Sequence, residues 1–177
     1  MLRVGAGDRD ACSQLVDRHL GRIVAFAGRT LGDRTEAEDV AQEVFVRLWT
    51  RASDWRSGRG QLTTWLHRVA FNLCLDRLGR RRERPIDEAT EPIDPNPSVT
   101  ALLQQGDIGR CVNEELAVLP DQQKIAITLC HYQGLRNLEA AEVMGISVEA
   151  LESLLARGRR TLRSRLRHLV PDLLGGL

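Results

Sequence analysis

Arginine residues gather in two blocks of the chain, and arginine is the side chain best suited to bind nucleic acid. Of the 25 basic residues only Lys124 is a lysine; residues 54–84 carry eight basic and three acidic side chains, and residues 122–177 carry eight and five. The guanidinium group makes bidentate hydrogen bonds to phosphate and to guanine. Nucleic acid is therefore the first partner to consider, although a genome rich in G and C would give the same arginine content.

The second basic block also has the spacing of a helix-turn-helix. Ala141 is followed four positions later by Gly145, and then by Leu151 and Leu154. Two helices that cross steeply need a small residue at their contact and a glycine at the turn, and Ser147 can cap the second helix. The first turns of that helix would enter the major groove. The candidate base-contacting residues are Ser147, Glu149, Ala150, Ser153 and Arg157, and the candidate phosphate-contacting residues are Arg159, Arg160 and Arg163.

Two alternatives stay open for this segment, since protein-interaction domains also contain helical hairpins and an arginine face can simply be solvated. The first basic block is equally open. Trp65 follows a Gly- and Arg-rich loop and could stack on unpaired bases, or it could belong to the core, like most tryptophans at helical spacing. Its polar and basic neighbours are Arg56, Arg59, His67, Arg68, Asn72, Arg77 and Arg80.

One predicted helix carries an acidic face formed by Glu38, Asp39, Gln42 and Glu43. Negative charge repels DNA phosphate, so this face is either solvated surface or a docking face for a basic protein. Acid/base catalysis is a poor interpretation, because no nucleophile, metal-ligand set or phosphate loop accompanies these residues. The widely spaced cysteines predict neither a disulfide framework nor a zinc site, and we expect buried thiols and no cofactor. They are Cys12, Cys74, Cys111 and Cys130.

Apolar periodicity predicts an all-α fold with two helical domains. Aromatic residues make up only 4% of the chain, and residues 83–99 hold four of the six prolines. Proline removes a backbone donor and disfavours helix at the preceding residue. We therefore expect a first domain over residues 1–84, a flexible acidic linker over 85–100 and a second domain over 101–177.

Several local features are also expected. Asp33 should cap a helix with Glu36 completing a capping box, and the inward face of that helix should be Ala37, Val40, Ala41, Val44, Phe45 and Leu48. Gly21 marks a possible helix break, Pro120 should be the first residue of a helix reaching Tyr132, and Trp49 and Trp55 should pack.

The longest uninterrupted apolar run, Ile23 to Ala27, is far shorter than the roughly 20 residues of a membrane span. The N-terminus also lacks the apolar region of a signal peptide. We expect a cytoplasmic protein without membrane insertion.

Four ordered segments together resemble the extracytoplasmic-function (ECF) group of bacterial sigma factors. They are DRTEAEDVAQEVFVRLW, TTWLHRVAFNLCLDRLGRRR, LAVLPDQQKIAITLCHYQGL and NLEAAEVMGISVEALESLLARGRRTL. The resemblance covers nearly the whole chain and implies a sigma-two domain followed by a sigma-four helix-turn-helix domain. It further implies a non-enzymatic subunit that binds core RNA polymerase and promoter DNA and is controlled by an anti-sigma factor.

The resemblance also implies roles for individual residues. The acidic face would dock on the polymerase, with Glu38 beside Asp39, Gln42 and Glu43. The minus-ten promoter element would be recognised by Arg56, Arg59, Trp65, Arg68, Asn72, Asp76, Arg77 and Arg80. The minus-35 element would be recognised by Ser147, Glu149, Ala150, Ser153, Arg157 and Arg160.

The chain departs from the family pattern in two places. Glu152 and Leu154 stand where the family commonly has a lysine and an arginine, and Ala156 stands at a commonly basic position. Ser153 and Arg157 are then expected to carry more of the minus-35 contact. Leu62 replaces the usual aromatic residue before the Thr-Trp pair, which argues against stacking at the loop tip.

Two other functions account for parts of the sequence. A free-standing DNA-binding regulator would use only the helix-turn-helix, residues 120 to 170. An adaptor protein would use its helical hairpins to bind protein, and it would show no salt-dependent binding to DNA.

Overall fold

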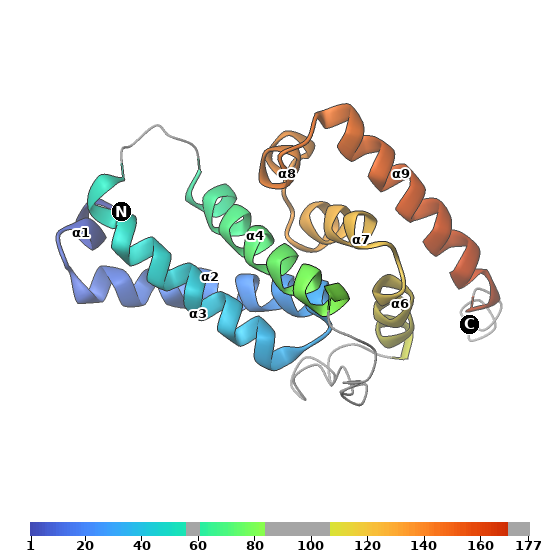
Figure 1. Ribbon diagram of the computed structural model, residues 1–177, viewed down its shortest axis with the longest axis horizontal. Coiled ribbons are helices and arrows are strands. Elements are labelled where there is room, and N and C mark those ends of the chain that lie inside the picture. The colour runs from blue at the N-terminus through green and yellow to red at the C-terminus, as the bar shows by residue number, and fades with distance from the viewer. Residues whose placement is uncertain (56–60, 84–106, 170–177) are drawn as a thin grey trace, which may run out of the picture.

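The computed structural model of the protein describes residues 1–55, 61–83 and 107–169, and within these ranges it contains helices and no strands (Figure 1). The first helical unit contains α1 (Leu2–Gly5), α2 (Arg9–Leu31), α3 (Arg34–Arg51), the short η1 (Ala52–Asp54) and α4 (Leu62–Glu83). The second helical unit contains α6 (Asp107–Ala117), α7 (Asp121–Ile127), η3 (Thr128–Tyr132), α8 (Asn137–Met144), α9 (Val148–Arg165) and η4 (Leu166–Leu169). The expected all-α class is confirmed, whereas the expected linker lies outside the described residues.

α2 is continuous through Gly21, so the expected break there is wrong. Its N-cap is Asp8, whose side chain accepts a hydrogen bond from the Ala11 amide at 3.0 Å. Beyond Gly21 it buries Ile23 and Phe26 against the rest of the first unit. A glycine inside a helix costs about 1 kcal/mol, which is small compared with the burial of two large side chains.

α3 buries the face that its periodicity predicts: Ala37, Val40, Ala41, Val44, Phe45 and Leu48. Its cap is also as expected, since the Asp33 side chain accepts a hydrogen bond from the Glu36 amide at 2.9 Å. Glu36 does not complete the expected capping box. Its carboxylate instead pairs with Arg81 of α4 at 3.0 Å. Arg81 also donates to the Leu31 carbonyl at 2.7 Å, and so joins α2, α3 and α4.

In the second unit, Pro120 is the N-cap of α7 and not its first residue, and the helix widens into the π-helical turn η3. The helix-turn-helix follows as α8 and α9. Gly145 adopts the left-handed conformation at φ 67°, and the Ser147 side chain accepts a hydrogen bond from the Ala150 amide at 3.2 Å. The expected turn and cap of this motif are thus both present.

Alanine at Gly145 and at Gly21 should have opposite effects on stability. Both glycines face open space, so that backbone conformation alone separates them. A non-glycine residue in the left-handed region costs about 1 to 2 kcal/mol, whereas replacing glycine within a helix gains about 0.5 to 1 kcal/mol. Urea unfolding followed by circular dichroism should therefore give a lower free energy of unfolding for Gly145→Ala than for the natural chain, and a higher one for Gly21→Ala. Equal free energies for the two variants would contradict the assignment of the turn.

The two helical units pack against each other and share one hydrophobic core. α8 lies against α4, and α2 lies against η3 and α7; Figure 1 shows the second unit on the open side of α4. At this contact His67 is 1% exposed. Its Nδ1 lies 2.8 Å from the Thr63 carbonyl oxygen, and its Nε2 lies 3.4 Å from Oε1 of Gln133.

Burial makes the stability of the protein sensitive to mild acid. Desolvation lowers the pKa of His67, more than its hydrogen bonds to Thr63 and Gln133 raise it, and Arg22 and His19 lower it further. Because the unfolded chain binds the proton more readily, the free energy of unfolding should fall as pH drops below about 6.5. Urea titrations at several pH values should show this loss, and His67→Gln should flatten the profile; an unchanged profile would contradict it.

Candidate nucleic-acid interface

The outward face of α9 presents the residues expected to contact DNA. Ser147, Glu149, Ala150, Ser153, Arg157 and Arg160 are all exposed. Leu151 and Leu155 are buried on the opposite face. The helix is held close to α7, since a β-carbon on Gly158 would lie 2.6 Å from Cδ1 of Ile127. This close contact fixes which side of α9 faces outward.

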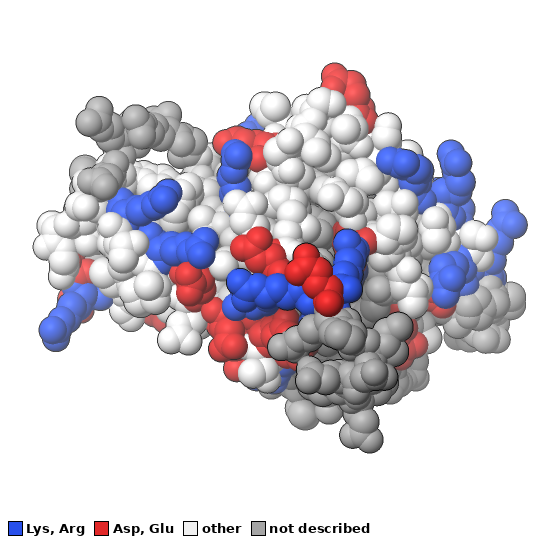
Figure 2. Space-filling model, viewed as in Figure 1, with Lys and Arg blue, Asp and Glu red and all other residues white. Residues whose placement is uncertain are grey.

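Charge changes sign along α9. Its first turns carry Glu149 and Glu152, and the later turns and η4 carry Arg157, Arg159, Arg160, Arg163, Arg165 and Arg167. Figure 2 shows basic side chains along the C-terminal part of α9, at the right of the view. Arg165 pairs with Glu115 of α6, which gives it a role in the fold. The exposed arginines of the later turns can contact phosphate.

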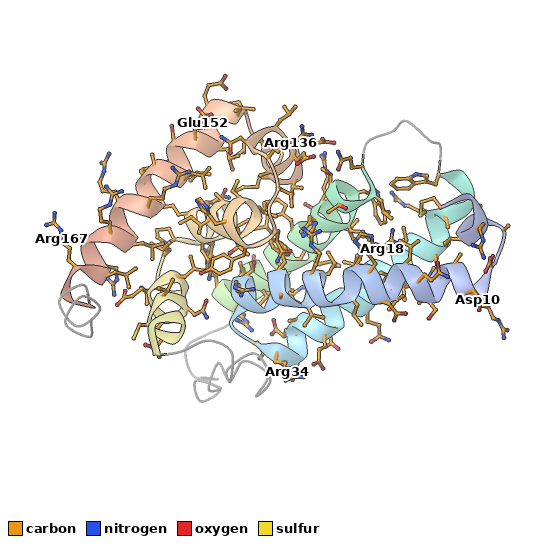
Figure 3. All side chains as sticks on the ribbon, turned by 180° about the vertical axis from the view of Figure 1, so that it is seen from behind. Asp10, Arg18, Arg34, Arg136, Glu152 and Arg167 are labelled. Carbon is orange, nitrogen blue, oxygen red and sulfur yellow. The ribbon has the colours of Figure 1, made fainter. Side chains whose placement is uncertain are left out.

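Glu152 is held at the surface by the first helix of the motif. Asn137 Nδ2 donates a hydrogen bond to Glu152 Oε1 at 3.2 Å, and the Cys130 thiol lies 3.9 Å from Asn137 Oδ1. Figure 3 places Glu152 near the N-terminal end of α9, far along the helix from Arg167. The Glu152 carboxylate therefore joins α8 to α9. Hydrogen bonds from the Glu149 amide and from Ser147 lower the pKa of the Glu149 carboxyl. It therefore stays ionised to a lower pH than an ordinary glutamate does.

α4 carries a second exposed stripe, defined here as Arg68, Asn72, Asp76 and Arg80. These residues are four apart, so they lie in one row along the helix. Trp65, one turn before the row, is partly buried, and its ring meets Trp55 edge-on with centroids 5.9 Å apart. Arg77 is partly buried and donates to the Leu73 carbonyl at 3.3 Å. Arg56 and Arg59 lie outside the described residues.

The acidic face of α3 is exposed at all four expected positions, Glu38, Asp39, Gln42 and Glu43. Surface ion pairs join Glu38 to Arg34 at 2.8 Å and Glu43 to Arg47 at 2.9 Å. Such exposed pairs contribute at most about 1 kcal/mol each. The carboxylates are thus free to meet a partner at little cost to the fold.

Two apolar residues on the same side of α3 were missed by the sequence analysis. Val46 is 44% exposed and Trp49 is 46% exposed, although Trp49 was expected to pack. Its ring meets Phe45, with centroids 6.5 Å apart and the planes tilted by 43°. Val46 lies four positions after Gln42 and three after Glu43, a helical spacing that places it among the acidic side chains. Exposed apolar side chains within a charged face are typical of a protein-binding surface.

Family comparisons identify both helical units. The family model for Sigma-70 region 2 matches residues 15–84, and the model for Sigma-70, region 4 matches residues 109–162. The chain is 30% identical over 168 residues to the ECF RNA polymerase sigma factor SigK of Mycobacterium tuberculosis, covering 92% of this chain and 89% of SigK. The chain belongs to the ECF RNA polymerase sigma factor family. This sigma factor is also 29% identical over 180 residues to SigW of Bacillus subtilis, covering 94% and 95% of the two chains.

Solved structures agree with this assignment. CnrH, in complex with the cytosolic domain of CnrY, shares 29% identity with this sigma factor at a TM-score of 0.68, covering 94% of both chains. The sigma factor RpoE of Bartonella quintana, in complex with the anti-sigma factor NepR, is 24% identical with a TM-score of 0.72, covering 88% of this chain and 96% of RpoE. The latter likeness concerns the fold. In this sigma factor, region 2 covers most of α2 through α4, and region 4 begins in α6 and ends in α9.

The family consists of transcription initiation factors and not of enzymes. Within the described ranges no group of three or more His, Cys, Asp or Glu side chains is arranged to hold a metal ion. The expectation that the cysteines are buried holds only for Cys74, whose pKa burial raises to about 12. None of the helices in the described part of the chain is long and apolar enough to cross a membrane.

Proposed function

We propose that this sigma factor binds core RNA polymerase in the cytoplasm and directs it to promoters through two separate DNA-binding surfaces. The domain over residues 1–84 would recognise the minus-ten element, the domain over 101–177 the minus-35 element, and the acidic segment 85–100 would connect them. The observation that carries the proposal is that regions 2 and 4 each present an exposed polar row on a helix buried along its other side.

The α4 stripe suits recognition of opened DNA. Arg68 and Arg80 can neutralise phosphates, and Asn72 and Asp76 between them can hydrogen-bond to base edges. Trp65 supports this role because its ring is only partly buried, which leaves part of it to stack on an unpaired base. Arg56, Arg59 and Arg77 would add positive charge beside the row.

The face of α9 suits recognition of duplex DNA in the major groove. Ser147, Glu149, Ala150 and Ser153 occupy the first turns, which reach base edges in helix-turn-helix proteins. Arg157 and Arg160 follow, where arginine can contact guanine or phosphate.

Arg157→Ala should weaken promoter binding by the polymerase complex about 5- to 150-fold, equivalent to about 1 to 3 kcal/mol, if Arg157 contacts a base. The fold should tolerate the change, because the side chain makes one exposed bond, to the Ser153 carbonyl at 3.3 Å. Fluorescence anisotropy with promoters altered base by base measures both affinity and sequence preference. Arg167→Ala, at an exposed arginine beyond α9, is the matched control. Unchanged preference in Arg157→Ala would remove this residue from the interface.

The acidic face of α3, together with Val46 and Trp49, would dock on core RNA polymerase. An anti-sigma factor would control that step; the 29% identical CnrH is likewise held in a complex, with the cytosolic domain of CnrY. Run-off transcription with purified core polymerase on genomic fragments tests the function as a whole. Transcripts that start at defined sites only when this chain is added are the expected result, and their absence would refute the proposal.

A further inference from the structure

The helix-turn-helix holds one exposed carboxylate from the side, near the start of its second helix. Glu152 lies in the first turns of α9 and is exposed. Its Oε1 accepts a hydrogen bond of 3.2 Å from Nδ2 of Asn137, the first residue of α8. The Cys130 thiol donates to Oδ1 of the same amide at 3.9 Å. These three side chains therefore form a short chain of hydrogen bonds that ends on the outer face of α9.

The chemistry of the three groups fixes how the Asn137 amide is turned. An ionised carboxylate only accepts hydrogen bonds, so the amide nitrogen must face Glu152. The amide oxygen then faces Cys130, whose thiol can donate. A side chain that is already held in place loses less conformational freedom when it binds. Asn137 therefore prepares the Glu152 carboxylate to meet a partner.

Glu152 has room for that partner on the side away from α8. Among the described residues, Oε2 of Glu152 accepts no hydrogen bond. Ala156 lies one helical turn further along the same face and is exposed, so that only a methyl group stands beside the carboxylate there. The exposed arginines of the later turns can neutralise phosphates while the carboxylate faces the groove. They are Arg157, Arg160 and Arg163.

A carboxylate in the major groove distinguishes bases by the type of hydrogen bond that each base edge offers. Cytosine presents the N4 amino group, a donor. Guanine presents the acceptors N7 and O6, and thymine presents the acceptor O4 and a methyl group. Adenine presents its N6 donor next to the acceptor N7, whose lone pair repels a second carboxylate oxygen. Cytosine is therefore the base that suits a carboxylate best.

We propose that Glu152 is a specificity-determining residue that selects a cytosine in the minus-35 element through its N4 amino group, and that Asn137 is the positioning residue that holds the Glu152 carboxylate for this contact. The inference rests on the proposed function, because it names the base that one more residue of the α9 face reads. Glu152 touches the base itself, whereas Asn137 acts through Glu152.

Selection from a library of duplexes tests the contact. The probe is DNA of random sequence, long enough to span both promoter elements, which is bound by core polymerase with the full chain and then sequenced. The natural chain should enrich cytosine at one minus-35 position about fivefold or more over each other base. At that position Glu152→Gln should prefer adenine and Glu152→Arg should prefer guanine, since these side chains make bidentate bonds to those bases. Glu152→Gln keeps the size and shape of the side chain, so it answers the question if Glu152→Arg fails to fold.

Asn137→Ala separates a positioning role from a structural one. The variant should lower the preference for cytosine about two- to fivefold, the effect of one exposed hydrogen bond, and leave the bases selected elsewhere in the site unchanged. Asn137→Asp should lower it further, because it places a second carboxylate beside Glu152. Glu142→Ala, which removes an exposed carboxylate of α8, is the control and should change no preference. Circular dichroism checks that each variant is folded.

The outcomes distinguish this inference from the proposed function. If the natural chain selects a sequence and the Glu152 variants select the same bases, Glu152 reads no base and the inference is wrong, while the proposed function stands. A preference of the natural chain for another base at the position that the variants change would overturn the assignment of cytosine. Unaltered selection by Asn137→Ala would overturn the positioning role. A library from which the natural chain selects no sequence would overturn both the inference and the proposed function.

Discussion

Asp39→Arg combined with Glu43→Arg should abolish binding of the sigma factor to core RNA polymerase, with at least a 100-fold loss of affinity. The two changes remove two negative charges from the acidic face and add two positive ones, so that its net charge rises by four. Like charges placed opposite each other across an interface cost several kcal/mol. The fold should survive, because both side chains are exposed and Glu43 makes only a surface ion pair with Arg47. Titration of labelled sigma factor with core polymerase measures the loss.

The control for this experiment makes the same change of charge on another helix. Asp10 and Asp17 are exposed acidic residues of α2, and Asp10→Arg with Asp17→Arg changes the net charge equally. This control pair should bind polymerase nearly as the natural chain does. Equal binding by the Asp39, Glu43 variant would show that α3 is not the docking surface.

Phe26→Ala should lower the free energy of unfolding by about 3 to 5 kcal/mol, the cost of removing a buried aromatic ring. Phe26 has no exposed surface. Its ring meets His67 edge-on, with centroids 5.7 Å apart and the planes at 73°. The ring thus supports both the first unit and the buried histidine at the contact with the second. Urea unfolding followed by circular dichroism measures the loss.

Leu20→Ala is the comparison for Phe26→Ala. Leu20 is on the same helix but is 39% exposed, so that less apolar surface returns to water and the loss should stay below about 1.5 kcal/mol. A Phe26→Ala loss no larger than that of Leu20→Ala would mean that α2 does not form the centre of the core.

Local sequence rules were sufficient where a structure depends on residues within one or two turns. The buried face of α3, the caps at Asp33 and Ser147 and the turn at Gly145 follow from spacing, side-chain oxygens and a positive φ. The exposed rows of α4 and α9 follow from the same periodicity, because burial of one side of a helix determines which side remains for a partner.

The sequence by itself therefore determined the helices, the helix-turn-helix and which polar residues line each exposed face. Only the tertiary structure decided that α2 continues through Gly21, that Trp49 is exposed, and that His67 and Gln133, 66 positions apart, meet inside a shared core. Helix periodicity repeats every 3.6 residues and carries no information on which distant face covers which. That choice depends on the summed burial of surfaces far apart in the chain, and it is what holds the two helical units together.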